Sequence, residues 1–194
     1  MIEPGPNTFS YMNQIAKSLH LPGDVAEFGV FKGNNSWHYA SLMQYEKPNK
    51  RLHLFDTFSG LPRDVLDKCD LTRFDDTSLE SVTKVMEPFD FVDFHTGMFN
   101  ESVLEMNTFQ EFCAVIIDCD LYQSYLDCLD YVYDRMVVGG VIIFDEYYSK
   151  KYPLARVAVD EFFSDKKEKP EIFWIDNNGW ERWRIVKQLS GDEK

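Results

Sequence analysis

The sequence predicts an α/β fold, a three-layer sandwich whose mostly parallel sheet ends in an antiparallel hairpin at the C-terminus. Two apolar runs, residues 114–117 and 141–144, each lead directly into acidic residues. Short runs that are apolar at every position are typical of strands buried on both faces of a parallel sheet. Two later apolar runs flank the turn Asn177-Asn178-Gly179, which indicates the hairpin. Segments with helical spacing alternate with the strands, and this is the order of an α/β sandwich.

Length, charge and cysteine content restrict the class of protein. The 194 residues suffice for a core, so we expect a single domain over residues 1–194. The 33 acidic and 20 basic residues give a net charge of −13, which repels phosphate backbones and anionic lipids, so no nucleic-acid or membrane partner is expected. The four cysteines form no C-x-x-C pair and are expected to be reduced, and the N-terminus lacks the regions of a signal peptide. A cytoplasmic protein is therefore expected, with a homo-oligomer left open.

The first part of the chain predicts a short helix, then two strands joined through a loop and a helix. Met12, Ile15 and Leu19 fall at helical spacing, which predicts a helix over about residues 7–20 that Asn7 can cap. The following strand, loop, helix and second strand are predicted over residues 24–30, 31–35, 36–45 and 51–56. Glycines in the loop allow its backbone to approach a ligand closely.

The second part predicts three further helices, one more parallel strand beside the two apolar runs, and the hairpin. The polar segment 63–76 is expected to be an irregular, mobile surface segment. Gly139 and Gly140 are expected to form a turn before the strand that starts at Val141. The remaining elements are a helix over 78–88, a strand over 91–95, helices over 121–136 and 154–163, and hairpin strands over 171–176 and 180–186.

The glycine loop after the first strand points to a cofactor without a pyrophosphate. Gly29 and Gly33 are spaced as G-x-x-x-G and not as the G-x-G-x-x-G of dinucleotide sites. S-adenosylmethionine lacks a pyrophosphate, and its sulfonium and amino groups are better met by acids. Asp56 ends the second strand, where nucleoside-binding α/β folds hold ribose hydroxyls. The alternative is that Gly29 and Gly33 are ordinary turn glycines.

Four acidic residues follow two strands that we expect to lie side by side. Asp118 and Asp120 follow one strand, and Asp145 and Glu146 follow the other. In open α/β sheets ligands bind at this edge. Carboxylates about 4 Å apart repel by on the order of 4 kcal/mol per pair at an effective dielectric of about 20, so protons or a cation must compensate. Oxygen ligands alone favour a hard ion such as Mg²⁺. The alternative is that Asp118 or Asp120 caps the helix that starts at Leu121.

Five motifs between about residues 22 and 163 resemble the macrocin O-methyltransferase (TylF) family. They are residues 23–30, 54–62, 97–99, 118–124 and 139–147. The Asp-x-Asp-Leu-Tyr element, together with the later acidic pair, is the most specific part. The family comprises metal-dependent enzymes that methylate sugar hydroxyls of macrolide and aminocoumarin antibiotics. The resemblance therefore implies the Rossmann-like sheet of S-adenosylmethionine-dependent methyltransferases.

The resemblance also implies roles for particular residues. Asp118, Asp145 and Glu146 would hold Mg²⁺, and Asp120 would be the general base. The residues implied to line S-adenosylmethionine are Glu27, Phe28, Gly29, Val30, Phe31, Gly33, Asp56, Thr57, Phe58, Gly60, Gly97, Met98, Phe99 and Asp118.

The residues and the resemblance together predict an S-adenosylmethionine- and Mg²⁺-dependent O-methyltransferase acting on a hydroxyl of a sugar, small polyol or natural product. Three departures from the family pattern leave the acceptor open. Glu146 stands where the family usually has aspartate, Asn34 where it has glycine, and Met98 where it has tryptophan. One alternative is a catechol-type metal-dependent O-methyltransferase with an aromatic acceptor. Another is a non-catalytic S-adenosylmethionine-binding module, which has no need of four acids at this edge.

Overall fold

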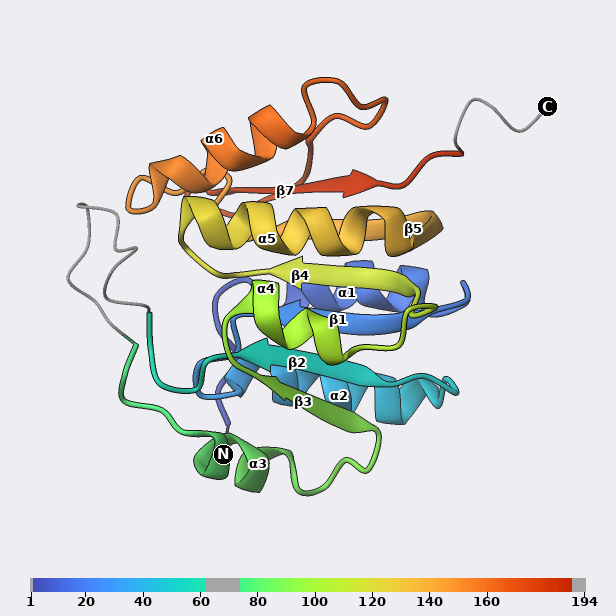
Figure 1. Ribbon diagram of the computed structural model, residues 1–194, viewed down its shortest axis with the longest axis vertical. Helices are drawn as coiled ribbons and strands as arrows, with labels where there is room; N and C mark the ends of the chain where they lie inside the picture. Colours follow the sequence, from blue (N-terminus) through green and yellow to red (C-terminus); the bar gives the residue numbers. More distant parts are fainter. Residues whose placement is uncertain (1, 62–73, 190–194) are drawn as a thin grey trace.

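The computed structural model describes residues 2–61 and 74–189 and contains a seven-stranded sheet of order β3-β2-β1-β4-β5-β7-β6 (Figure 1). The first five strands pair in parallel, whereas β7 runs antiparallel to both β5 and β6. The predicted α/β architecture with a C-terminal antiparallel hairpin is confirmed. The strands are β1 Asp24–Phe28, β2 Leu52–Asp56, β3 Val92–Thr96, β4 Phe112–Ile117, β5 Met136–Phe144, β6 Glu171–Ile175 and β7 Glu181–Val186.

Helices cover both faces of the sheet and complete the three layers. Helices α1 to α3 pack on one face, and α4 to α6 pack on the other (Figure 1). Every residue of β4 is buried, as the apolar run at the centre of the sequence predicts, because β4 lies in the middle of the sheet between two helical layers. The helices are α1 Thr8–Ser18, α2 Asn34–Glu46, α3 Leu79–Met86, α4 Phe99–Ser102, α5 Tyr122–Val132 and α6 Pro153–Phe162, with 3₁₀ turns at Val103–Glu105 and Tyr133–Arg135.

Strand register places the ends of β1, β4 and β5 at one level. Ile117 of β4 pairs with Phe28 of β1 on one side and with Phe144 of β5 on the other. The residues that follow these three strands are therefore neighbours across the sheet edge. The backbone register alone therefore brings the glycine loop, Asp118 and Asp145 together.

Two local predictions are wrong. Gly139 and Gly140 lie within β5 instead of forming a turn. They pair with the residue that follows β7: the Gly139 N–H donates to the Lys187 carbonyl (2.9 Å), and the Lys187 N–H donates to the Gly140 carbonyl (2.8 Å). Met136 begins β5 instead of ending the preceding helix, since α5 stops at Val132 and passes through a 3₁₀ turn. Met136 is apolar and buried in either arrangement, so the apolar pattern does not distinguish the end of a helix from the start of a strand.

Three further predictions concern the cap of α1, the segment 63–76 and the cysteines. Asn7 occupies the N-cap position of α1 but makes no side-chain cap hydrogen bond. Most of segment 63–76 lies outside the described residues. Cys113, Cys119 and Cys128 are buried and unpaired, in line with reduced thiols.

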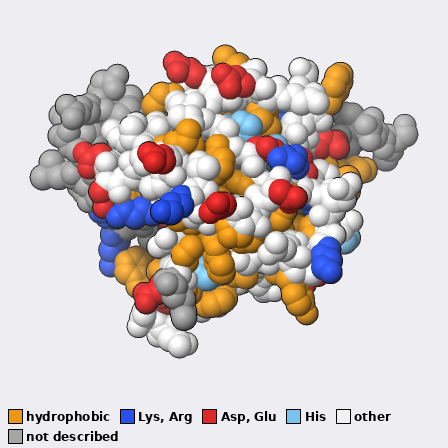
Figure 2. All heavy atoms as spheres, turned by 90° about the horizontal axis from the view of Figure 1, so that it is seen from below, with side chains coloured by type: hydrophobic (Ala, Val, Ile, Leu, Met, Phe, Trp, Pro, Cys, Tyr) orange, Lys and Arg blue, Asp and Glu red, His pale blue; other side chains and the backbone are white. Residues whose placement is uncertain are grey.

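The distribution of surface charge and the helix lengths are relevant to possible nucleic-acid and membrane partners. On the face shown in Figure 2, the Lys and Arg side chains of the described residues form small separate groups among acidic and apolar ones. Within residues 2–61 and 74–189 no helix is long and apolar enough to cross a bilayer. The expected absence of nucleic-acid and membrane partners stays a prediction.

Candidate active site

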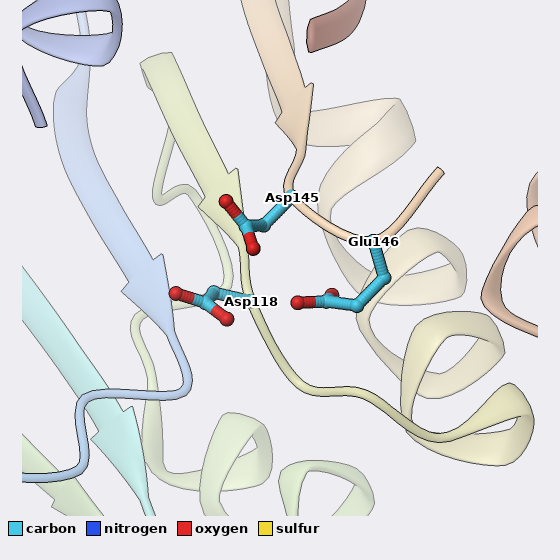
Figure 3. Close-up of side chains that lie close together, drawn as sticks. All are labelled: Asp118, Asp145 and Glu146. Carbon is cyan, nitrogen blue, oxygen red and sulfur yellow. The ribbon is translucent and has the colours of Figure 1, made fainter. Parts of the chain in front are cut away.

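Three acidic side chains from two adjacent strand ends converge on one point. Asp118 follows β4, and Asp145 and Glu146 follow β5, so that one carboxylate oxygen of each lies within 4.8 Å of the others (Figure 3). Burial, followed by repulsion from the neighbouring carboxylates, raises the pKa of both Asp118 and Glu146 well above the usual range. The acids therefore favour either shared protons or a bound cation.

The donor set fits a hard divalent cation. Among the described residues, no lysine, arginine or histidine forms an ion pair with these three carboxylates. Two tyrosine hydroxyls donate to them instead: that of Tyr11 to Asp145, and that of Tyr125 to Glu146 Oε2 (2.6 Å). A neutral hydroxyl orients a carboxylate but does not cancel its charge. Carboxylate oxygens in this number and with this spacing suit Mg²⁺ better than a softer metal.

A cavity of about 300 Å³ opens beside the acids, and Asp118 is part of its wall. Twelve of the residues predicted as cofactor-binding or catalytic line this cavity. They are Glu27, Gly29, Val30, Phe31, Asp56, Thr57, Gly60, Gly97, Met98, Phe99, Asp118 and Asp120.

Three predicted cofactor residues do not line the cavity. Phe28 is fully buried and stacks on Phe55 in the core, with ring centroids 4.3 Å apart. Phe58 is buried in the core, with its ring centroid 6.0 Å from that of Phe94 in β3, and Gly33 forms the N-cap of α2 in a left-handed conformation. Alternation along β1 turns Phe28 toward a helical layer, while its neighbour Glu27 reaches the cavity.

The sequence analysis missed several residues of the wall. Lys32, Asn34 and Asn35 lie next to the residues predicted to bind the cofactor in the glycine loop. This position could have identified them as wall residues. Leu61, Cys119 and Ser124 also lie within the motifs 54–62 and 118–124, so the same signal was available for them. Gly5 and Phe74 come from other segments and have no local signal. The missed wall residues are Gly5, Lys32, Asn34, Asn35, Leu61, Phe74, Cys119 and Ser124.

Asp56 ties two loops of the cavity wall together. Its Oδ2 accepts hydrogen bonds from the backbone N–H groups of Val30 (2.7 Å) and Phe31 (2.9 Å), and its Oδ1 accepts one from Phe58 (2.8 Å). Each carboxylate oxygen has two acceptor positions. The Thr57 hydroxyl also lies 3.4 Å from Oδ1, but its single hydrogen is better placed for the Gly60 carbonyl (2.7 Å), so Oδ1 keeps capacity for another donor such as a hydroxyl. The acid that ends β2 thus fixes the glycine loop and faces the cavity at the same time.

Asp120 lies in the cavity wall in an unusual backbone conformation. Its φ of +61° is in the left-handed region, and the residue is 8% exposed. The N-cap of α5 is Leu121, so neither Asp118 nor Asp120 occupies the capping position that was the alternative explanation of these acids. Asp120 is not a member of the three-acid group, and its separate place beside the cavity suits a role other than metal binding.

Glu27 is a buried acid in the cavity wall. It is 1% exposed, and burial raises its pKa from 4.5 to about 8, although the Ser36 hydroxyl donates a hydrogen bond to it. Between these two pH values the folded protein therefore binds more protons at this position than the unfolded chain does. It follows that the contribution of Glu27 to stability declines as pH rises from about 4.5 through 8.

A neutral amide at position 27 is expected to remove this decline. The free energy of unfolding of the wild type, relative to Glu27→Gln, should fall between pH 5 and pH 8. Urea unfolding at several pH values measures the difference, with Glu87→Gln at an exposed position as the control. Parallel pH profiles for wild type and Glu27→Gln would show that Glu27 is ionised in the fold.

The model of the macrocin-O-methyltransferase (TylF) family matches residues 8–184, which is most of the chain. The chain belongs to this family. The resemblance found in the sequence motifs is thereby confirmed, and this macrocin O-methyltransferase family member is an enzyme of the O-methyltransferase class.

Two relatives with named activities are similar to this macrocin O-methyltransferase family member. Demethyldecarbamoylnovobiocin O-methyltransferase of Streptomyces niveus is 28% identical over 181 residues, which cover 85% of this chain and 68% of the relative. A Streptomyces olivaceus enzyme, 8-demethyl-8-(2,3-dimethoxy-alpha-L-rhamnosyl)-tetracenomycin-C 4'-O-methyltransferase, is 28% identical over 141 residues, which cover 66% of this chain and 54% of the relative. The chain thus spans only about half of the second relative.

Solved structures share the fold of this family member. The O-methyltransferase NovP superposes with a TM-score of 0.76 at 22% identity, covering 94% of this chain and 78% of its own. The calicheamicin methyltransferase CalS11 superposes with a TM-score of 0.79 at 20% identity, covering 93% and 78%. Both similarities show that the sheet and its helical layers are those of a Rossmann-like methyltransferase.

Proposed function

We propose that this enzyme transfers a methyl group from S-adenosylmethionine to a hydroxyl of a sugar, small polyol or natural product, with Mg²⁺ bound at the three acids. The observation that carries the proposal is the shared position of Asp118, which belongs both to the acid group and to the cavity wall. The two named relatives support the acceptor class, because one is named for demethyldecarbamoylnovobiocin and the other for a rhamnosyl group of a tetracenomycin.

We assign three segments of the cavity wall to S-adenosylmethionine: the glycine loop, the loop after β2 and residues 97–99. When bound, the cofactor supplies an electrophilic methyl group on a sulfonium. Asp56 has acceptor capacity for ribose hydroxyls, and the carboxyl oxygens of Glu27 and Asp118 can accept hydrogen bonds from the positively charged part. The wall residues exclude water from the cavity and fix the orientation of its contents, and positioning of this kind supplies much of the rate in transfer reactions.

Asp118, Asp145 and Glu146 would hold Mg²⁺. When bound, the ion supplies positive charge that offsets the carboxylates and lowers the pKa of an acceptor hydroxyl. With the cofactor bound, the methyl group would pass from the sulfonium sulfur to the acceptor oxygen and leave a neutral thioether. The carboxylate of Asp120 would accept the proton that leaves the hydroxyl. General-base assistance of this kind typically contributes about 10²- to 10⁴-fold to the rate.

A methyl-transfer assay with and without metal tests the proposal. Methylated product is expected from glycoside acceptors in the presence of Mg²⁺, and most of it should disappear when EDTA is added and return with excess Mg²⁺. Binding of S-adenosylhomocysteine, measured by calorimetry, should persist in EDTA. Catechol acceptors serve as the comparison.

Three results would contradict this function. Transfer to catechols but not to glycosides would favour the aromatic-acceptor alternative. Cofactor binding with no transfer to any hydroxyl acceptor would favour a binding module. Transfer that is indifferent to EDTA would remove Mg²⁺ from the reaction.

A further inference from the structure

The N-terminal helix reaches the acid group from outside the strand ends that form it. Asn7 Nδ2 donates a hydrogen bond to Asp145 Oδ1 (2.9 Å), and the Tyr11 hydroxyl donates to the same oxygen. The two donors lie 138 and 134 residues before Asp145 in the chain. A contact over this distance depends entirely on how α1 packs against the sheet.

The two donors occupy the acceptor capacity of one carboxylate oxygen. An ionised carboxylate oxygen has two lone-pair positions, and Asp145 Oδ1 uses both, one for Asn7 and one for Tyr11. Oδ2 is then the oxygen left for a cation. The hydrogen bonds therefore select which oxygen of Asp145 is presented and hold the side chain in one orientation.

Helix α1 is itself held firmly in place. Tyr11 is fully buried, with its ring centroid 6.2 Å from that of Phe173 in β6. One turn further along, the Gln14 side-chain oxygen accepts a hydrogen bond from Arg184 of β7. A donor that is already fixed by core packing loses little conformational entropy when it orients a carboxylate, so the fully buried Tyr11 suits this task.

A similar arrangement holds the third acid. The fully buried Tyr125 donates to Glu146 Oε2 (2.6 Å), which fills one of the two acceptor positions of that oxygen and orients the carboxylate. Tyr125 comes from α5, directly after β4, and so belongs to the same strand–helix unit as Asp118. Asp145 differs because its donors come from a helix that precedes the first strand.

The same turn of α1 also touches the cavity. The Thr8 hydroxyl donates to Asn35 Oδ1 (2.5 Å), and Asn35 and Gly5 both line the cavity wall. Beside the acids, Asn7 Oδ1 is buried and has no hydrogen-bond partner among the described residues. A buried amide oxygen without a partner is costly unless water or a ligand hydroxyl binds it.

We propose that Asn7 and Tyr11 are positioning residues for the metal site, so that the start of α1 is a functional part of the active site. The inference rests on the proposed function, because it presumes that the three acids bind a divalent cation. Hydrogen-bond partners of metal-binding carboxylates typically change metal affinity or activity by about 10- to 100-fold when they are removed. Asn7 and Tyr11 should act through Asp145 without touching the cation themselves.

Metal affinity of single-site variants tests the inference. Tyr11→Phe removes one hydroxyl and keeps the ring, and Asn7→Ala removes the second donor at a partly exposed position. Mn²⁺, followed by electron paramagnetic resonance, is the probe, with Mg²⁺ as competitor. Each variant is expected to bind Mn²⁺ about 10- to 100-fold more weakly than the wild type. Its affinity for S-adenosylhomocysteine in EDTA and its circular dichroism should not change.

A matched control separates positioning from the general loss of a buried hydroxyl. Tyr131 in α5 has a buried hydroxyl with no hydrogen-bond partner among the described residues, so Tyr131→Phe makes the same chemical change elsewhere in the core. Unchanged Mn²⁺ affinity is expected for this variant.

The possible failures are distinguishable. If the wild type binds no Mn²⁺, the metal part of the proposed function fails and this inference fails with it. If the wild type binds Mn²⁺ and folded Tyr11→Phe and Asn7→Ala bind it equally well, the inference alone is overturned. If Tyr11→Phe does not fold, Asn7→Ala decides, because its side chain lies at the helix end and not in the core.

Discussion

Asp120→Asn is expected to lower kcat by about 10²- to 10⁴-fold and to leave the affinity for S-adenosylmethionine nearly intact. The amide is close in shape to the carboxylate but cannot accept the proton of the acceptor hydroxyl. Asparagine also tolerates the left-handed backbone found at this position (φ +61°), whereas alanine would add strain there. The change therefore tests the proton acceptor with little disturbance of the fold. Steady-state kinetics with saturating Mg²⁺ and calorimetric cofactor binding provide the two measurements.

The control for Asp120→Asn is the same substitution at an exposed acid of the following helix. Asp130→Asn should retain wild-type kcat, since Asp130 is exposed on α5 and is not part of the cavity wall. An Asp120→Asn variant that keeps full activity would remove Asp120 from the mechanism. Loss of cofactor affinity in parallel with kcat would assign Asp120 to binding instead of proton transfer.

Gly29→Ala is expected to destabilise the protein by about 3 to 5 kcal/mol and to abolish cofactor binding. Gly29 has φ +92°, and a Cβ atom there would lie 1.8 Å from the carbonyl oxygen of Asp118. This overlap involves backbone, so β1 and β4 must move apart at their carboxyl ends. Asp118 would be displaced from the acid group by the same movement. Urea unfolding and calorimetry with S-adenosylhomocysteine measure the two effects.

Gly179→Ala separates the clash from the backbone strain. Gly179 in the hairpin turn has a similar φ of +81°, but a Cβ atom there meets nothing within 4 Å. Its substitution should cost only the left-handed strain, about 1 to 2 kcal/mol, and leave binding unchanged. Equal losses of stability at the two positions would mean that the approach of Gly29 to Asp118 is unimportant.

Local sequence carries most of the information about the sheet and its edge. Apolar runs that end in acids locate the strand ends at Ile117 and Phe144, and Asn177-Asn178-Gly179 locates the hairpin, because burial on both faces and turn geometry each impose their own residue types. Where one residue type suits two structures, the sequence is ambiguous. Met136 is the example, since it is buried at the start of β5 and would be equally buried at the end of a helix.

By itself the sequence determined the α/β order of elements, the glycine loop, and the placement of Asp118, Asp145 and Glu146 at one edge, since neighbouring parallel strands end at the same level. Only the tertiary structure decided which residues surround that edge. No periodicity or motif in the sequence indicates the hydrogen bonds of Asn7 and Tyr11 to Asp145. They arise because α1 packs on the face of the sheet formed by β4 and β5, with its N-terminal end near the acids. Such long-range packing is fixed by the shape of the whole core and not by neighbours in the chain.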